Sequence, residues 1–192
     1  QACLEPEVGA ELIAYGIGKG IHFLDTAELY GLYPTLKILY RQVRRDALQL
    51  ATKSYCYDEE TAKRSVEGAL EAMGLDYLDI FLLHEQESSH TLRGHEKAIE
   101  QLLRYKEQGL VKAIGISTHH IAGVEATLKR PEIEIVHPIY NRKGYGIVDG
   151  TAEQMLSAIM KAKEAGKGLY AMKILGGGHL INSAREEIGA AL

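Results

Sequence analysis

Four polar residues stand at or just past the ends of apolar segments that are typical of buried strands. Asp25 ends one such segment, and Tyr30 follows it five residues later in an expected loop. Lys53 and His84 end two further segments. Each of these residue types can take part in proton transfer, so together they indicate a site for acid–base chemistry.

A tyrosine beside a lysine and a carboxylate can act as a proton donor. A phenol has a pKa of about 10, and a neighbouring ammonium group lowers that pKa. Asp25 would keep Lys53 charged, and Lys53 would tune Tyr30, which could then protonate a developing alkoxide. His84 would orient the carbonyl or share in the proton transfer. The set suits reduction of a carbonyl, and because no side chain donates hydride, a cofactor is required.

Each residue taken alone also has a simpler interpretation. Lys53 can be a solvated lysine at a strand end, and Asp25 can be a turn or cap residue. Tyr30 can be a half-buried loop aromatic, and His84 can be a hydrogen-bonded histidine without a catalytic role. Their occurrence at equivalent strand ends favours the catalytic interpretation.

A metal site is the other chemical interpretation of this region. Its ligands would come from Asp25, His84, His119 and His137. Lys53 in the same ring would repel a divalent cation, so we expect no metal. A metal-dependent barrel hydrolase is therefore a lesser alternative.

Helical and strand patterns alternate along the chain. Strands are expected at about 21–25, 47–53, 78–84, 111–117, 133–137 and 168–173. Helices are expected at 6–19 and 59–73 and at about 34–42, 94–108, 120–129 and 151–165, with a last one after Ser183. Asp58 and Gly74 should cap the helix at 59–73, and Thr151 or Asp149 should lie near the cap of the helix at 151–165. A glycine-rich loop covers 141–150.

This alternation predicts an α/β fold with a parallel sheet, in a single domain over residues 1–192. A doubly wound dinucleotide-binding sheet would carry G-x-G-x-x-G directly after its first strand. The nearest match, Gly16–Gly20, precedes a strand and indicates a helix end. A (β/α)8 barrel accounts better for the polar residues, because its chemistry comes from the C-terminal ends of several strands. Those ends are expected to carry Asp25, Lys53, His84, Ser117, His137 and Lys173.

Composition narrows the class of protein further. The formal net charge of −4 argues against a nucleic-acid-binding face, and no apolar run approaches a membrane span. The two cysteines, Cys3 and Cys56, form neither a disulfide framework nor a metal-ligand pattern. A cytoplasmic protein acting on a small molecule is the expectation.

Several motifs resemble those of the aldo-keto reductase family. The matching segments are Phe23–Gly31, Ala51–Lys53, Asp76–Asp79 leading to Leu83-His84, Gly115–Ser117 and Pro138–Asn141. The first of these is highly specific, and the motifs together cover nearly the whole chain. The variant segments Leu83–Ser88, Met172-Lys173 and Gly176–Gly178 resemble a prokaryotic branch of the family.

The resemblance implies a (β/α)8 barrel that reduces aldehydes or ketones with NADPH and without a metal. Tyr30 matches the family's acid, and Asp25, Lys53 and His84 match the rest of its catalytic four. Cofactor contacts are expected from Ser117, Thr118, His137, Met172, Leu175, Gly176 and Gly177. Among them, Ser117 would contact the nicotinamide carboxamide, and the loop at Leu175 and Gly176 would cover the pyrophosphate.

Some positions depart from the family pattern. Thr118 stands where the family usually has Asn, and His137 stands where it usually has Gln. Met172 aligns with an aromatic residue that commonly stacks on the nicotinamide, and Lys173-Ile174 replaces a Ser-Pro pair. A non-catalytic barrel that serves as a redox-sensing or binding subunit is the alternative function.

Length is the largest departure. A (β/α)8 barrel typically needs about 250 residues, and six strands are expected in these 192 residues. By alignment, the first strand would precede Gln1 and the eighth would follow Leu192, so we expect a part of a longer protein. Because the family holds the adenosine phosphate after that eighth strand, we expect this length of chain to bind NADPH weakly. Members of the prokaryotic branch often carry a C-terminal iron–sulfur region, for which no cysteine cluster is present.

Overall fold

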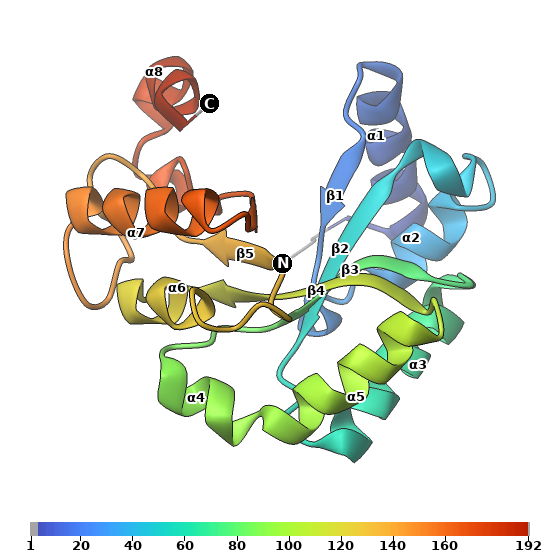
Figure 1. Cartoon of the computed structure of the whole chain (residues 1–192). Helices are drawn as coiled ribbons and strands as arrows, with labels where there is room; N and C mark the ends of the chain where they lie inside the picture. The colour runs from blue at the N-terminus through green and yellow to red at the C-terminus, as the bar shows by residue number, and fades with distance from the viewer. Residues whose placement is uncertain (1–3, 192) are drawn as a thin grey trace. The chain divides into compact units, whose positions relative to one another are not determined.

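A computed structural model describes residues 4–191, in which helices alternate with six parallel strands (Figure 1). The strand order in the sheet follows the chain, from β1 to β6. The strands are β1 (Phe23–Asp25), β2 (Gln49–Ser54), β3 (Leu78–Leu83), β4 (Val111–Thr118), β5 (Ile135–Pro138) and β6 (Gly168–Leu169). The α/β alternation and the number of strands predicted from the sequence are confirmed.

The chain forms two compact units. The first holds the residues up to Leu82 together with Glu96–Ile114, and the second holds Leu83–His95 together with the residues from Gly115 onwards. Strands β3 and β4 run covalently from one unit into the other. A single domain over the whole chain stays a prediction.

In the first unit, four helices follow one another around the first strands. They are α1 (Pro6–Gly18), α2 (Tyr33–Leu39), α3 (Glu59–Met73) and α5 (Glu96–Glu107). Helix α1 packs on α2, α2 on α3, and α3 on α5, which lies beside it in Figure 1. Gly16–Gly18 are the last residues of α1, so the glycines there form a helix end as predicted.

The ends of α3 are those that its sequence predicts. The Asp58 Oδ1 accepts a hydrogen bond from the Thr61 N–H at 2.8 Å, and the Thr61 hydroxyl accepts one from the Asp58 N–H at 3.1 Å. Gly74 ends the helix with a φ of 69°, in the left-handed region that glycine adopts without strain. Strand β2 lies buried along all but its first residue, as expected for a parallel strand covered on both faces.

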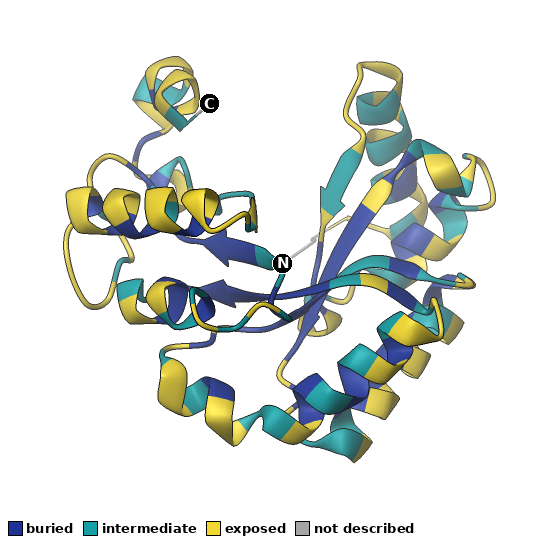
Figure 2. Ribbon diagram, viewed as in Figure 1, coloured by how far each residue is buried: buried dark blue, intermediate teal, exposed yellow. Residues whose placement is uncertain are grey.

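In the second unit, β5 pairs in parallel with the end of β4, from Gly115 opposite Ile135 to Thr118 opposite Pro138. The helices of this unit are α4 (Ser89–Gly94), α6 (Ile121–Thr127), α7 (Ala152–Glu164) and α8 (Ala184–Ala191). Helix α6 packs against both α4 and α7. Figure 2 shows the strands mostly buried, with the exposed residues on the outer helix faces and in loops.

One expected strand is shorter in the structure, and one helix of the structure was not predicted. The strand expected at 168–173 is limited to Gly168–Leu169, followed by one isolated bridge between Met172 and Ile139. Lys173 has a φ of 57°, which a strand cannot contain, so pairing with β5 does not continue past the bridge at Met172. The helix expected at 94–108 is confirmed as α5, and a short helix that was not predicted, α4, precedes it and begins at a capping box on Ser88.

The alternative caps of the helix at 151–165 are resolved by the structure. Thr151 is the N-cap of α7, and its hydroxyl accepts a hydrogen bond from the Gln154 N–H at 3.3 Å. Asp149 instead accepts from the N–H groups of Ile121 and Ala122, at 2.7 and 3.0 Å, and so caps the start of α6. The glycine-rich loop is thereby fastened to a helix that precedes it in the chain.

Gly123 allows α6 to lie close to the loop that follows β3. A Cβ at this position would lie 2.3 Å from the Thr118 Oγ1 and 2.5 Å from the Gln86 carbonyl oxygen. Gly68 in α3 is also helical but exposed, and a Cβ there would meet nothing within 4 Å. A substitution at Gly123 therefore tests close packing, whereas a substitution at Gly68 tests helix propensity.

We predict opposite effects of alanine at these two positions. Gly123→Ala should lower the free energy of unfolding by about 1–3 kcal/mol, because a backbone oxygen must move to admit the methyl group. Gly68→Ala should raise it by up to about 1 kcal/mol, because alanine loses less conformational entropy in a helix. Urea unfolding followed by circular dichroism measures both. Equal changes in the two variants would contradict the close approach at Gly123.

Candidate active site

Lys53 is buried inside the first unit, with 2% of its surface exposed. Its Nζ donates hydrogen bonds to the Asp25 Oδ1 at 2.6 Å and to the Thr26 carbonyl oxygen at 2.7 Å. Strands β1 and β2 pair in parallel with Asp25 opposite Ala51, so the lysine reaches the end of the neighbouring strand. The interpretation of Lys53 as a solvated strand-end lysine is therefore wrong.

Burial and pairing act in opposite directions on Lys53. Burial lowers the pKa of its ammonium, and the carboxylate of Asp25 opposes that change. The Asp25 side chain is itself partly exposed and forms the ion pair through Oδ1. The pair thus fixes the buried Lys53 ammonium at the end of β1.

Tyr30 lies near this charge, in the short 3-10 helix Glu28–Tyr30 that follows β1. The Lys53 Nζ is 5.3 Å from the centroid of the Tyr30 ring, within the range of cation–π attraction. Gly31 follows with a φ of 70° and turns the chain at the end of this helix. The structure therefore brings together Asp25, Lys53 and Tyr30, three of the four residues predicted for proton transfer.

His84 directly follows β3, is buried, and belongs to the second unit. The turn after it is held to β4, because the Ser117 Oγ accepts from the Glu85 N–H at 2.9 Å and the Ser117 carbonyl accepts from the Gln86 N–H at 2.8 Å. Glu85 has a φ of 54°, which such a tight turn requires. The role of His84 in proton transfer stays a prediction.

The residues expected near the nicotinamide are fixed by hydrogen bonds within the second unit. Ser117 and Thr118 have no exposed surface, and the Thr118 hydroxyl accepts from the His120 N–H at 2.9 Å. His137 donates from Nδ1 to the Tyr170 carbonyl at 2.7 Å and stacks on the Tyr170 ring with centroids 3.9 Å apart. The stacked tyrosine was not predicted, because the pair is far apart in the sequence.

The remaining expected cofactor residues lie in the segment after β6. The Met172 N–H donates to the Pro138 carbonyl at 2.9 Å, which ties this segment to β5. Leu175 is half-buried, Gly176 is buried and Gly177 is exposed, and the N–H of Gly176 donates to the Lys173 carbonyl at 2.7 Å. This segment therefore forms a tight turn of its own.

An open pocket of about 570 Å³ lies along this turn. Its lining includes Lys173, Gly176, Gly177 and His179. The Lys173 Nζ lies 3.0 Å from the His119 Nε2, and burial together with the nearby lysine lowers the pKa of His119. A neutral His119 can accept from the ammonium, so the positive charge of this pair resides on Lys173.

From the sequence, His119 was considered only as a possible metal ligand. Within residues 4–191, no group of three His, Cys, Asp or Glu side chains is placed to hold a metal ion. The side chain of His119 instead contacts Lys173, 54 positions away, which no local sequence signal could indicate.

None of the helices described is long and apolar enough to cross a membrane.

Comparison with known proteins identifies the family. The model of the aldo/keto reductase family matches residues 4–190. The chain belongs to this family. Methylglyoxal reductase DkgA of Yersinia pestis is 26% identical over 178 residues, which are 85% of this chain and 61% of the relative. Glyoxal reductase of Bacillus subtilis is 31% identical over 128 residues, 65% of this chain and 45% of the relative.

Solved structures show the same fold. An aldo-keto reductase of Bombyx mori in complex with NADP has a TM-score of 0.71 at 16% identity, covering 91% of this chain and 59% of the other. An aldo-keto reductase of Bacillus halodurans in its holo form has a TM-score of 0.71 at 22% identity, covering 91% and 58%. The fold is thus α/β, of the (β/α)8 barrel type, with six strands described. The chain spans about three fifths or less of the length of these relatives.

The lowered pKa of Lys53 predicts a pH dependence of stability. Between that pKa and the value of about 10.4 in the unfolded chain, the unfolded state binds more protons, so the contribution of Lys53 to the free energy of unfolding rises with pH. We expect the difference in unfolding free energy between the original chain and Lys53→Met to increase from pH 7 to pH 10. For each tenfold decrease in the proton affinity of Lys53 on folding, this difference in unfolding free energy increases by about 1.4 kcal/mol in total.

Urea unfolding at each pH measures this difference. Lys63→Met is the control, because it removes a partly exposed positive charge of the same unit. A difference between the original chain and Lys53→Met that falls as the pH rises would contradict burial as the main cause.

Proposed function

We propose that the protein containing this chain reduces an aldehyde or ketone to an alcohol, with Tyr30 as the proton donor and a nicotinamide cofactor as the hydride source. Membership of the aldo/keto reductase family supports the reaction class. The observation that carries the assignment to these residues is the buried Lys53 ammonium, held by Asp25 and 5.3 Å from the Tyr30 ring.

Tyr30, Lys53 and Asp25 of the first unit have different roles in the proposed reaction. A bound nicotinamide cofactor supplies hydride to the carbonyl carbon. The carbonyl oxygen then gains negative charge and takes the hydroxyl proton of Tyr30, which leaves a phenolate. The Lys53 ammonium stabilises that phenolate, and Asp25 with the Thr26 carbonyl keeps the ammonium in place.

His84 is proposed to hydrogen-bond the substrate carbonyl. This proposal rests on its place directly after β3 and on the family pattern. The Ser117 contacts to the turn that follows His84 would limit the movement of its backbone. Positioning of this kind is valuable because general acid catalysis requires hydrogen-bond contact with the reacting atom.

The second unit is proposed to hold the cofactor, and its residues fit a phosphate-bearing one. Ser117, Thr118, His137 and Met172 would lie at the nicotinamide end, with Leu175, Gly176 and Gly177 at the pyrophosphate. At Gly177 a Cβ would meet nothing within 4 Å, so the turn is open, and Lys173 adds a positive charge to the pocket. Relatives crystallised with NADP or NADPH support NADPH as the first cofactor to test.

The substrate is proposed to be a small carbonyl compound. Relatives named methylglyoxal reductase and glyoxal reductase make methylglyoxal a reasonable first probe. The proposed general acid contacts only the carbonyl oxygen, so it does not select among substrates by the rest of their structure.

We predict that Tyr30→Phe lowers the rate of methylglyoxal-dependent NADPH oxidation by at least about 100-fold, because the proton donor is lost. Binding of NADPH should be nearly unchanged. Tyr15→Phe is the control, since Tyr15 is an exposed tyrosine of α1. Absorbance at the NADPH band measures turnover, and fluorescence titration measures binding.

The outcomes of this experiment separate the candidate functions. Turnover retained by Tyr30→Phe would remove this tyrosine as the acid. An original chain that binds NADPH but oxidises it with none of a panel of aldehydes and ketones would favour the non-catalytic alternative.

A second prediction concerns the positive charge at the cofactor pocket. Lys173→Met should weaken NADPH binding by roughly three- to tenfold, because one charge-assisted contact with a phosphate is lost. Lys163→Met removes an exposed lysine of α7 and should leave the affinity unchanged. Equal affinities of both variants for NADPH would show that Lys173 does not face the cofactor.

A further inference from the structure

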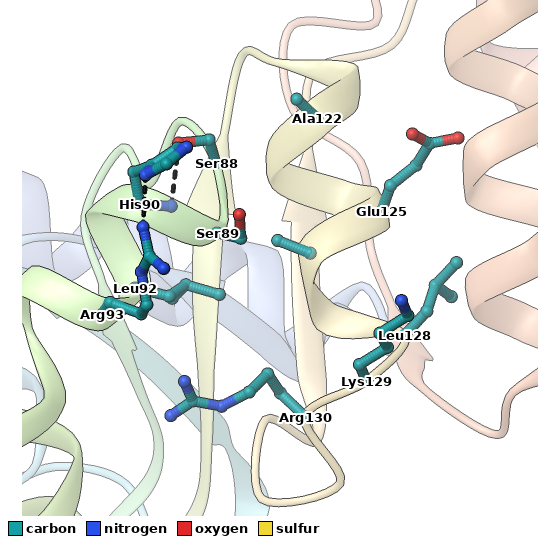
Figure 3. Close-up of a pocket in the computed structure, with 11 residues that line it drawn as sticks. Ser88, Ser89, His90, Leu92, Arg93, Ala122, Glu125, Leu128, Lys129 and Arg130 are labelled. Carbon is teal, nitrogen blue, oxygen red and sulfur yellow. Dashed lines mark hydrogen bonds between the residues drawn. The ribbon is translucent and has the colours of Figure 1, made fainter.

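A second large pocket lies between α4 and α6 of the second unit (Figure 3). Its volume is about 740 Å³. None of its lining residues belongs to the set predicted for catalysis or cofactor binding. A ligand here would therefore occupy a site separate from the proposed active site.

The inner surface of this pocket is largely apolar. Leu92 of α4 is buried, and Ala126 and Leu128 contribute from α6 and the residue that follows it. Small alanine side chains leave space between the two helices, which pack on each other elsewhere. Apolar surface of this kind favours a ligand with a hydrocarbon or aromatic body.

The rim of the pocket is positively charged. Arg93, Lys129 and Arg130 all line it, and the Arg93 guanidinium contacts the Nδ1 of His90 at 2.5 Å (Figure 3). Within the part of the chain that the structure describes, neither Arg93 nor Lys129 pairs with a carboxylate. The charge at the rim is therefore available to a ligand.

The acidic residues nearby do not cancel this charge. Glu125 lines the pocket but pairs with Lys161 of α7 at 3.3 Å, and Figure 3 shows it pointing away from α4. Glu132 pairs with Arg130, which leaves Arg93 and Lys129 to supply the positive charge. The rim is thus positive although the formal net charge of the chain is −4.

The size of the pocket favours a small ligand over a protein partner. A standard protein interface uses about 20–30 residues on each side, whereas 11 residues line this pocket. Ligand sites for small molecules typically have volumes of about 300–1,000 Å³, with an apolar lining and a few charged or polar groups. The pocket of about 740 Å³ belongs to this second class.

We propose that the pocket between α4 and α6 binds a small amphipathic organic anion, with its acidic group at Arg93 and Lys129 and its apolar body against Leu92, Ala126 and Leu128. The shared chemistry is one carboxylate, sulfonate or phosphate on an apolar body. The proposal does not depend on the proposed reductase function.

The probe for this proposal is 8-anilinonaphthalene-1-sulfonate, whose fluorescence rises on binding. N-phenyl-1-naphthylamine is its uncharged counterpart. The titrations use the 192-residue chain with saturating NADP⁺, so that binding at the proposed cofactor site does not contribute. We expect the sulfonate to bind at least about fivefold more tightly than the amine, because only the sulfonate can pair with the rim.

Substitutions locate the binding. Arg93→Gln combined with Lys129→Gln should weaken sulfonate binding at least about fivefold and leave amine binding unchanged. Lys163→Gln, an exposed lysine on the neighbouring α7, is the matched control and should have no effect. Circular dichroism confirms that the variants fold.

A second measurement needs no variant. In amide ¹H–¹⁵N spectra of the original chain, the sulfonate should shift the resonances of residues 88–93 and 121–130 most. Shifts concentrated elsewhere, or equal sulfonate affinities in the original chain and in the double variant, would overturn the proposal.

Discussion

A lysine with almost no exposed surface can remain charged only where other groups replace the water that it has lost. In this protein the Lys53 ammonium meets that condition through the Asp25 carboxylate and the Thr26 carbonyl, at 2.6 and 2.7 Å. Removing one partner of such a pair leaves a buried charge, which typically costs about 3–5 kcal/mol. These two hydrogen bonds join β2 to the end of β1 and to the first residue of the turn that leads to Tyr30.

The second unit uses polar residues mainly to hold turns at the ends of its strands. Ser117 binds the backbone of the turn after His84, and Thr118 binds the start of the segment leading to α6. Asn141 accepts from the Tyr145 N–H and donates to the Tyr145 carbonyl, both at 2.9 Å. Side-chain hydrogen bonds of this kind satisfy buried backbone groups and keep the loops in one conformation.

These structural hydrogen bonds limit what Ser117 and Thr118, two of the proposed cofactor residues, can offer to a ligand. The hydroxyl oxygens of Ser117 and Thr118 each accept a backbone N–H, which leaves one lone pair on each oxygen and the proton of Ser117 for a ligand. Thr118 also donates to the His120 carbonyl at 3.2 Å. Of the two, Ser117 is therefore the better candidate for a direct contact with nicotinamide.

Positive charge is distributed unevenly in the second unit. Lys173 stands beside His119, whose pKa is lowered, and Arg93 contacts the Nδ1 of His90, so the neighbour of each cation is a histidine ring and not a carboxylate. Each lies at the edge of a pocket. A charge held next to a hollow surface attracts anions more strongly than one on a convex surface, because the low-dielectric walls focus its field.

The sequence by itself determined the order of the strands and of the α-helices other than α4, the ends of α3 and the pairing of Asp25 with Lys53. Periodicity and capping depend on residues a few positions apart, and parallel strands align their ends, so these features can be inferred from the chain alone. Tertiary structure decided the early end of β6, the cap that Asp149 provides to α6, and the contact between His119 and Lys173. These features join residues 28 and 54 positions apart or depend on a backbone angle set by packing, so no local pattern contains them.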